Sequence, residues 1–134
     1  MKKFEAFSRH LDVLSKAGQE DLNNEFIVSG IIDKFNIQFE LGWKVLKELL
    51  AYEGRDISAS GSPRTIIKAA YAYFSFIDEE IWLRMLQERN NTAHIYNESL
   101  AKQLVQHILD EYIAEFCKMR KAIVELYGEE FLNS

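Results

Sequence analysis

The stretch VSGIIDKFNIQFELGWKVLKELL, residues 28–50, decides the fold. Its apolar residues return at alternating steps of four and three, which is the spacing of one face of an α-helix. The positions on this face are Val28, Ile32, Phe35, Phe39, Gly42, Leu46 and Leu49. The pattern predicts a long helix that packs along a left-handed seam and ends at Gly54. Gly42 has no side chain, so another helix can approach closely there.

The segments on both sides show the same helical spacing. Phe4, Phe7, Leu11 and Leu14 predict a first helix that ends near Gly18. In the second half of the chain the last helix is long, and its predicted seam runs through Val105, Leu109, Tyr112, Phe116, Met119, Ile123 and Leu126 up to Gly128. No segment alternates with a period of two residues, so no sheet is expected.

Two shorter helices are predicted by their capping residues. Ser62 followed by Pro63 is typical of a helix start, and this third helix runs to about Phe74. Asp78 is positioned to cap a fourth helix that continues to Arg89. The sequence therefore predicts one all-α domain over residues 1–134, an antiparallel up-and-down helical bundle of four main helices plus a short one. Phe26, Trp43 and Tyr127 flank the two long seams, and they favour a homodimer.

Composition excludes several classes of protein. The 134 residues include 48% hydrophobic residues, which is too apolar for a disordered chain, and a single cysteine, Cys117, which leaves no internal disulfide. The formal net charge of −5 argues against non-specific coating of nucleic acid. We expect no signal peptide, no membrane span and a cytoplasmic location. No metal-ligand cluster or cofactor fingerprint is present, so neither a metal nor a cofactor is expected.

The stretch RNNTAHIYNE, residues 89–98, holds the most reactive side chains. In an unbroken helix Arg89 and His94 would point to different faces, because five residues rotate by about 140° net. They can converge only if the helix ends between them, and Asn90 and Asn91 tolerate the left-handed conformation that stops helices. Tyr96 lies two residues after His94, so in an extended link both side chains point the same way. Asn97 is placed to cap the last helix.

Arg89 also continues an inward stripe formed by Asp78, Trp82 and Met85. A guanidinium group in that position requires a carboxylate partner or a cleft. Arginine suits phosphate groups and histidine exchanges protons near neutral pH, so the pair is consistent with phosphate chemistry. The alternative is a capped helix end in which arginine and a carboxylate form a structural pair.

Other charged residues have both a structural and a functional interpretation. Glu40 and Lys44 have the spacing of an ordinary ion pair on a helix surface, but Glu40 could instead orient Arg89 across the bundle. Asp33, seven residues earlier, could do the same. Arg64 and Lys68 lie one turn apart, which is typical of a solvated face or of a rim that attracts phosphate.

The residues together resemble the HEPN superfamily, whose R-x4-H-x-Y pattern matches Arg89, His94 and Tyr96. One branch, the nucleotidyltransferase substrate-binding proteins, is especially similar. Its second-helix motif corresponds to DKFNIQFELGWKVLK, with Asp33, Glu40 and Lys44, and its SPR helix start corresponds to residues 62–64. The resemblance covers residues 25–127.

The resemblance implies a homodimer paired with a minimal nucleotidyltransferase encoded by a neighbouring gene. The first role that the resemblance implies is that of a metal-independent HEPN ribonuclease toxin. In this role His94 would act as general base and Arg89 would stabilise charge on the phosphate. Asn90 would bind phosphate or hold the loop, and Tyr96 would be adenylylated by the antitoxin. The alternative is a non-catalytic subunit that binds a nucleotide or other substrate for the nucleotidyltransferase.

Overall fold

The computed structural model describes residues 1–55, 61–92 and 97–133, and all its regular structure is helical. In chain order the first half contains α1 (Lys2–Leu14), the 3-10 turn η1 (Ala17–Gln19), α2 (Glu25–Tyr52) and α3 (Pro63–Tyr73). The second half contains α4 (Glu79–Asn91), α5 (Glu98–His107), the π-helical turn η3 (Ile108–Tyr112), α6 (Ile113–Tyr127) and α7 (Glu129–Leu132). The described residues include no strand, as the sequence predicts.

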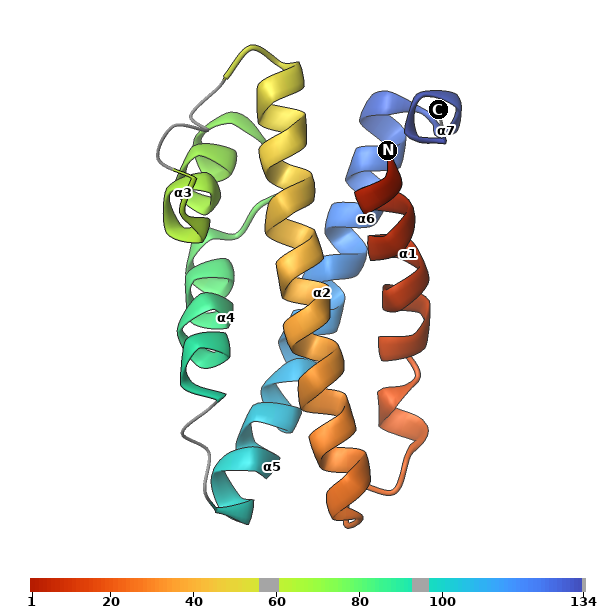
Figure 1. Ribbon diagram of the computed structural model, residues 1–134, viewed down its shortest axis with the longest axis vertical. Helices are drawn as coiled ribbons and strands as arrows, with labels where there is room; N and C mark the ends of the chain where they lie inside the picture. Colours follow the sequence, from red (N-terminus) through yellow and green to blue (C-terminus); the bar gives the residue numbers. More distant parts are fainter. Residues whose placement is uncertain (56–60, 93–96, 134) are drawn as a thin grey trace.

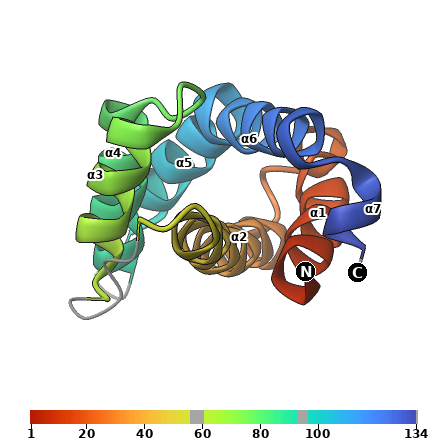
Figure 2. The same cartoon turned by 90° about the horizontal axis from the view of Figure 1, so that it is seen from above.

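The long helix α2 lies at the centre of the molecule. Figure 1 shows it between α4 on one side and α1 on the other, and the chain direction reverses from α1 to α2. Seen from above, α3 and α4 stand at one side of α2, while α5 and α6 cover it from behind (Figure 2). Contacts join α2 to α1, α3, α4 and α5, so this helix positions most of the others.

The predicted helix boundaries are largely confirmed by their caps. The side chains of Ser62, Asp78 and Asn97 each accept a hydrogen bond from a backbone N–H in the first turn of the helix that follows. At the other ends, Gly54 and Gly128 adopt positive φ angles of 75° and 81° after α2 and α6. Glycine takes this conformation without the steric cost that other residues incur.

The seam of the last helix differs from its prediction. Ile108 is completely buried, whereas Leu109, the predicted seam residue, is only partly buried. The π-helical turn that begins at Ile108 is the reason, because a π turn holds more residues than an α turn and shifts the buried face. In α2 the corresponding shift is smaller, with Ile31 more buried than Ile32.

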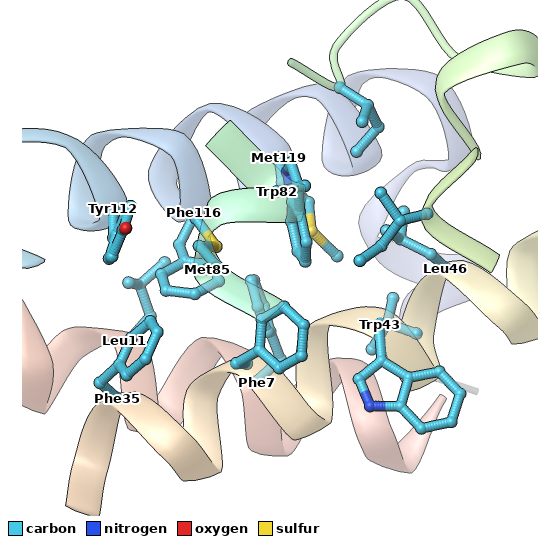
Figure 3. Packing of buried hydrophobic residues seen from close by; sticks show 14 of the residues in the cluster. Phe7, Leu11, Phe35, Trp43, Leu46, Trp82, Met85, Tyr112, Phe116 and Met119 are labelled. Carbon is cyan, nitrogen blue, oxygen red and sulfur yellow. The ribbon is translucent and has the colours of Figure 1, made fainter. Parts of the chain in front are cut away.

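The core is rich in aromatic rings, several of which are labelled in Figure 3. Trp82 is completely buried, with its ring centroid 5.9 Å from that of Phe39 and 5.6 Å from that of Phe116. A Cβ atom built at Gly42 would lie 3.0 Å from the Trp82 ring and 3.3 Å from the ring of Phe7. The predicted close approach at Gly42 therefore occurs, and side chains from α4 and α1 make it.

Two glycines of α2 allow this contact to be tested. Gly42→Ala is expected to lower the free energy of unfolding by about 1–2 kcal/mol, because overpacking against the enclosed Trp82 outweighs the gain in helix propensity. Gly30→Ala, where a Cβ would meet nothing within 4 Å, should raise it by up to about 1 kcal/mol. Urea denaturation of both variants measures the difference, and equal stabilisation by the two would show that Gly42 is not constrained.

Candidate functional site

The candidate site centres on Arg89, in the last turn of α4. Its guanidinium group forms an ion pair with the carboxylate of Glu40 on α2, and it lies 5.8 Å from the centroid of the Phe39 ring. Its Nη1 also donates a hydrogen bond of 2.9 Å to Oδ1 of Asn90. The Arg89 side chain is 29% exposed, so it lies at the edge of the core and still reaches solvent.

Helix direction explains why Arg89 meets Glu40. Side chains of a helix tilt toward its N-terminus. In Figure 1 α2 and α4 run in opposite directions, so their side chains lean toward each other along the common axis. Arg89 therefore points back along α4 and Glu40 points back along α2, and the two charged groups meet between the helices.

Glu40 holds three groups at once. Besides Arg89, it accepts a hydrogen bond of 3.2 Å from Nε1 of Trp43 and forms an ion pair of 3.5 Å with Nζ of Lys44. Glu40 therefore forms both the ion pair with Lys44 on the surface of its own helix and the ion pair with Arg89 across the bundle. Asp33 is not part of this group: it is exposed, and it forms no ion pair with any residue that the structure describes.

α4 ends at Asn91, which lies between Arg89 and His94 in the sequence as predicted, but it ends without the left-handed conformation expected of the asparagines. Asn90 and Asn91 both remain helical, and no non-glycine residue in the described ranges has a positive φ angle. Thr92 follows as the C-cap residue, and its hydroxyl donates a hydrogen bond of 2.8 Å to the backbone carbonyl of Arg89. The side-chain amide of Asn36, one turn before Glu40 on α2, donates to the Thr92 hydroxyl at 3.4 Å. Glu40 and Asn36 thus hold the side chain and the backbone of the same turn.

Sequence reasoning missed Asn36 and gave no role to Thr92, which belongs to the same motif as Arg89 and Asn90. No short-range pattern identifies their contact, because it joins residues 56 positions apart. His94 and Tyr96 lie outside the described residues, so their predicted positions next to Arg89 stay predictions.

An open groove of about 790 Å³ lies beside Arg89 along the outer face of α4. Ser62, Pro63 and Arg64, at the start of α3, also line it. The described structure therefore brings the SPR helix start and the RN motif to one surface. Lys68 does not line the groove and forms an ion pair of 3.7 Å with Glu79.

A second polar cluster lies behind Arg89, between α4 and the π-helical turn. Nδ1 of His107 is 2.7 Å from Oε1 of Glu88. Burial raises the pKa of the Tyr112 hydroxyl, and the nearby Glu88 carboxylate raises it further. Arg84 is paired with Glu111 in the same region. These contacts attach the last turns of α4 to the C-terminal helices.

Comparison with known proteins identifies the family of the chain. A family profile described as "Nucleotidyltransferase substrate binding protein like" matches residues 2–125. The chain belongs to this family. A search of curated proteins found no match. The family description favours the substrate-binding alternative over the ribonuclease toxin that the sequence analysis placed first.

Other findings limit the site in simpler ways. Within the described ranges, no group of three or more histidine, cysteine, aspartate or glutamate residues is arranged to hold a metal ion. None of the helices in the described residues is both long and apolar enough to cross a membrane.

Of the three aromatic residues expected at a dimer interface, Trp43 is buried within the chain and Phe26 is 88% exposed. Tyr127 is half-buried and packs against Phe131.

A double-mutant cycle tests whether Glu40 holds Arg89. Glu40→Ala is expected to lower the free energy of unfolding by about 1–3 kcal/mol, because it leaves a partly buried guanidinium group without its partner. Combined with Arg89→Ala, the two changes should cost less than their sum by at least about 0.5 kcal/mol. Lys44→Ala, which removes the exposed partner of the same carboxylate, should change stability by less than about 0.5 kcal/mol. Additive effects of Glu40→Ala and Arg89→Ala would disprove the coupling.

Proposed function

We propose that the chain is the non-catalytic substrate-binding subunit of a two-component nucleotidyltransferase, whose catalytic subunit is a separate small protein. The observation that carries the proposal is the position of Arg89 at the groove beside α4, in a chain that belongs to a substrate-binding family. A planar guanidinium group binds phosphate oxygens through two parallel hydrogen bonds. Glu40 and Phe39 position this group before any ligand arrives.

The charge distribution supports small-ligand binding. Arg89 is already compensated by Glu40, Arg84 by Glu111, and the whole chain carries a formal charge of −5. Such a surface has little long-range attraction for a polynucleotide, whose affinity depends on many uncompensated cations. It can still bind one phosphate-bearing molecule through directional hydrogen bonds at short range.

A pair of arginine variants tests this function. Arg89→Gln is expected to weaken binding of nucleoside mono- and triphosphates by about 10- to 100-fold, because one charge-assisted hydrogen-bonding group is lost. Arg120→Gln is the matched control, since Arg120 is equally enclosed and is paired with Asp12 on the α1 side of the molecule. Isothermal titration calorimetry of the two variants gives the comparison. Equal affinity of Arg89→Gln and the unchanged protein would refute the assignment.

The proposed partner is also directly testable. The neighbouring reading frame should encode a short protein with the Gly-Ser and paired-aspartate signature of a nucleotidyltransferase. The two purified proteins should elute together from a size-exclusion column. Failure of that protein to bind the chain would contradict the two-component assignment.

A second candidate function is the metal-independent ribonuclease toxin. The observation in its favour is that α4 ends at Asn91, two residues after Arg89 and before His94 in the sequence. In this reaction the RNA 2′-hydroxyl attacks the adjacent phosphorus and gives its proton to His94. Arg89 stabilises the charge that develops on the phosphate oxygens, and the bond to the 5′-oxygen breaks. The leaving 5′-oxygen needs a proton, which His94 of a second copy would supply in a homodimer.

Mixed dimers test the shared site. A dimer with one His94→Ala chain is expected to retain far less than half of the RNA cleavage of the unchanged dimer, because base and acid come from different chains. Cleavage is followed on total RNA with differently tagged chains purified in sequence. A loss of one half would exclude the shared site, and normal growth and intact RNA on induced expression of the unchanged protein would exclude the toxin.

A further inference from the structure

A second hollow lies toward the lower end of the molecule in Figure 1, between the end of α1, the turn η1 and the first turns of α2. The described linings of this hollow and of the groove beside α4 share no residue. Its volume is about 220 Å³. Most of its lining is apolar and consists of Val13, Leu14, Ala17, Phe26, Ile27, Gly30 and Ile31. The hollow therefore has the composition of a site for an apolar group.

Two apolar side chains at this hollow are exposed to water. Phe26 is 88% exposed and Val13 is 48% exposed, although both line the hollow. Gly30 leaves further open space, because a Cβ atom built there would meet nothing within 4 Å. Single exposed apolar residues are common on protein surfaces, but one ligand in this hollow would cover both. Covering them removes apolar surface from water, which favours binding.

The charged residues of the lining favour a negatively charged ligand. Lys16 and Lys34 belong to the lining, and neither forms an ion pair with any residue that the structure describes. Glu20 is the one carboxylate in the described lining, so two positive charges face one negative charge. This local excess of positive charge occurs in a chain with a formal net charge of −5. Lysine lays its methylene stem on an apolar wall while its ammonium group stays in water, so it attracts an anion at the rim.

The volume of the hollow restricts the ligand to a small molecule. Pockets for drug-sized ligands have volumes of about 300–1,000 Å³, which is more than this hollow offers. One water-sized group takes up about 30 Å³ of a liquid, so roughly seven such groups fill 220 Å³. An unbranched hydrocarbon chain of that length fits inside, with a charged end group at the rim.

We infer that this hollow binds a small amphipathic carboxylate, whose apolar chain lies against Phe26 and Gly30 and whose carboxylate lies beside Lys16 and Lys34. The inference goes beyond the proposed function and does not depend on it. Gly30 lies ten residues before Glu40 on α2, which is about 15 Å along the helix axis. A neutral ligand of the same chain length gains the apolar contacts but not the attraction to the lysines.

Titration of the full-length chain with sodium octanoate tests the site, with amide chemical shifts in nuclear magnetic resonance spectra as the readout. Saturable shifts should fall on the residues of the hollow. Octanol has the same chain length and no charge, and it should bind about two- to tenfold more weakly. Hexanoate, which is two methylene groups shorter, should bind more weakly than octanoate by up to about fourfold per methylene group.

Four variants locate the binding. Gly30→Leu should weaken octanoate binding at least about 10-fold, because the new side chain fills the hollow from a position with open space around it. Lys34→Gln should weaken octanoate binding about two- to fivefold and leave octanol binding within about twofold. Glu20→Gln should strengthen octanoate binding, since it removes the repelling carboxylate. Tyr52→Ala is the control, because Tyr52 is 63% exposed at the opposite end of α2 and should not affect binding.

Several results would overturn the inference. These are the absence of saturable shifts in the hollow, equal affinity for octanol and octanoate, and octanoate binding that neither Gly30→Leu nor Lys34→Gln weakens. Lys34→Gln changes one exposed side chain, so it keeps the test decisive if Gly30→Leu folds poorly. Nucleotide binding beside Arg89 is measured separately and should not change in these variants. Failure of either proposal therefore leaves the other standing.

Discussion

The missing side chain at Gly42 lets the indole of Trp82 lie directly against α2, and the position of α4 follows from this contact. Trp82 is held from its other sides by Phe39 and Phe116, so it cannot move without opening the core. A helix is a rigid element over a few turns, and Arg89 lies two turns after Trp82 on α4. Anchoring the tryptophan therefore anchors the arginine, and the side chains that lean from α2 toward α4 complete its surroundings.

The ion pair between Arg89 and Glu40 has a cost as well as a benefit. A ligand phosphate must share the guanidinium group with Glu40 or displace it, so part of the attraction is spent before binding begins. In return the planar group is held in one orientation, and its position does not depend on the ligand. Trp43 and Lys44 bind the same carboxylate. The arrangement favours recognition of a ligand by the orientation of its hydrogen bonds over long-range electrostatic attraction of the ligand.

Local signals in the sequence predicted most of the helices, because caps and periodicity act over a few residues. Asn97 caps the start of α5 with its side chain, and Gly54 follows the end of α2 with a positive φ angle. α4 ends at Asn91, as the asparagines predict, but the contact that joins Asn36 on α2 to Thr92 at this end has no local signal. The position of Arg64 and Arg89 along one groove has no signature either, since 25 residues and a turn of the chain separate them. Contacts between helices decided both features, and a single sequence does not display them.

The π-helical turn Ile108–Tyr112 divides what would otherwise be one continuous rod. Before it, α5 packs against α2; after it, α6 packs against α1. A turn with one surplus residue rotates the two halves relative to each other by roughly the angle of one helical position, about 100°. Removing a single residue there would restore an ideal helix and turn one half's apolar face into water. The surplus residue thus allows one continuous helical backbone to direct its apolar residues toward α2 before the turn and toward α1 after it.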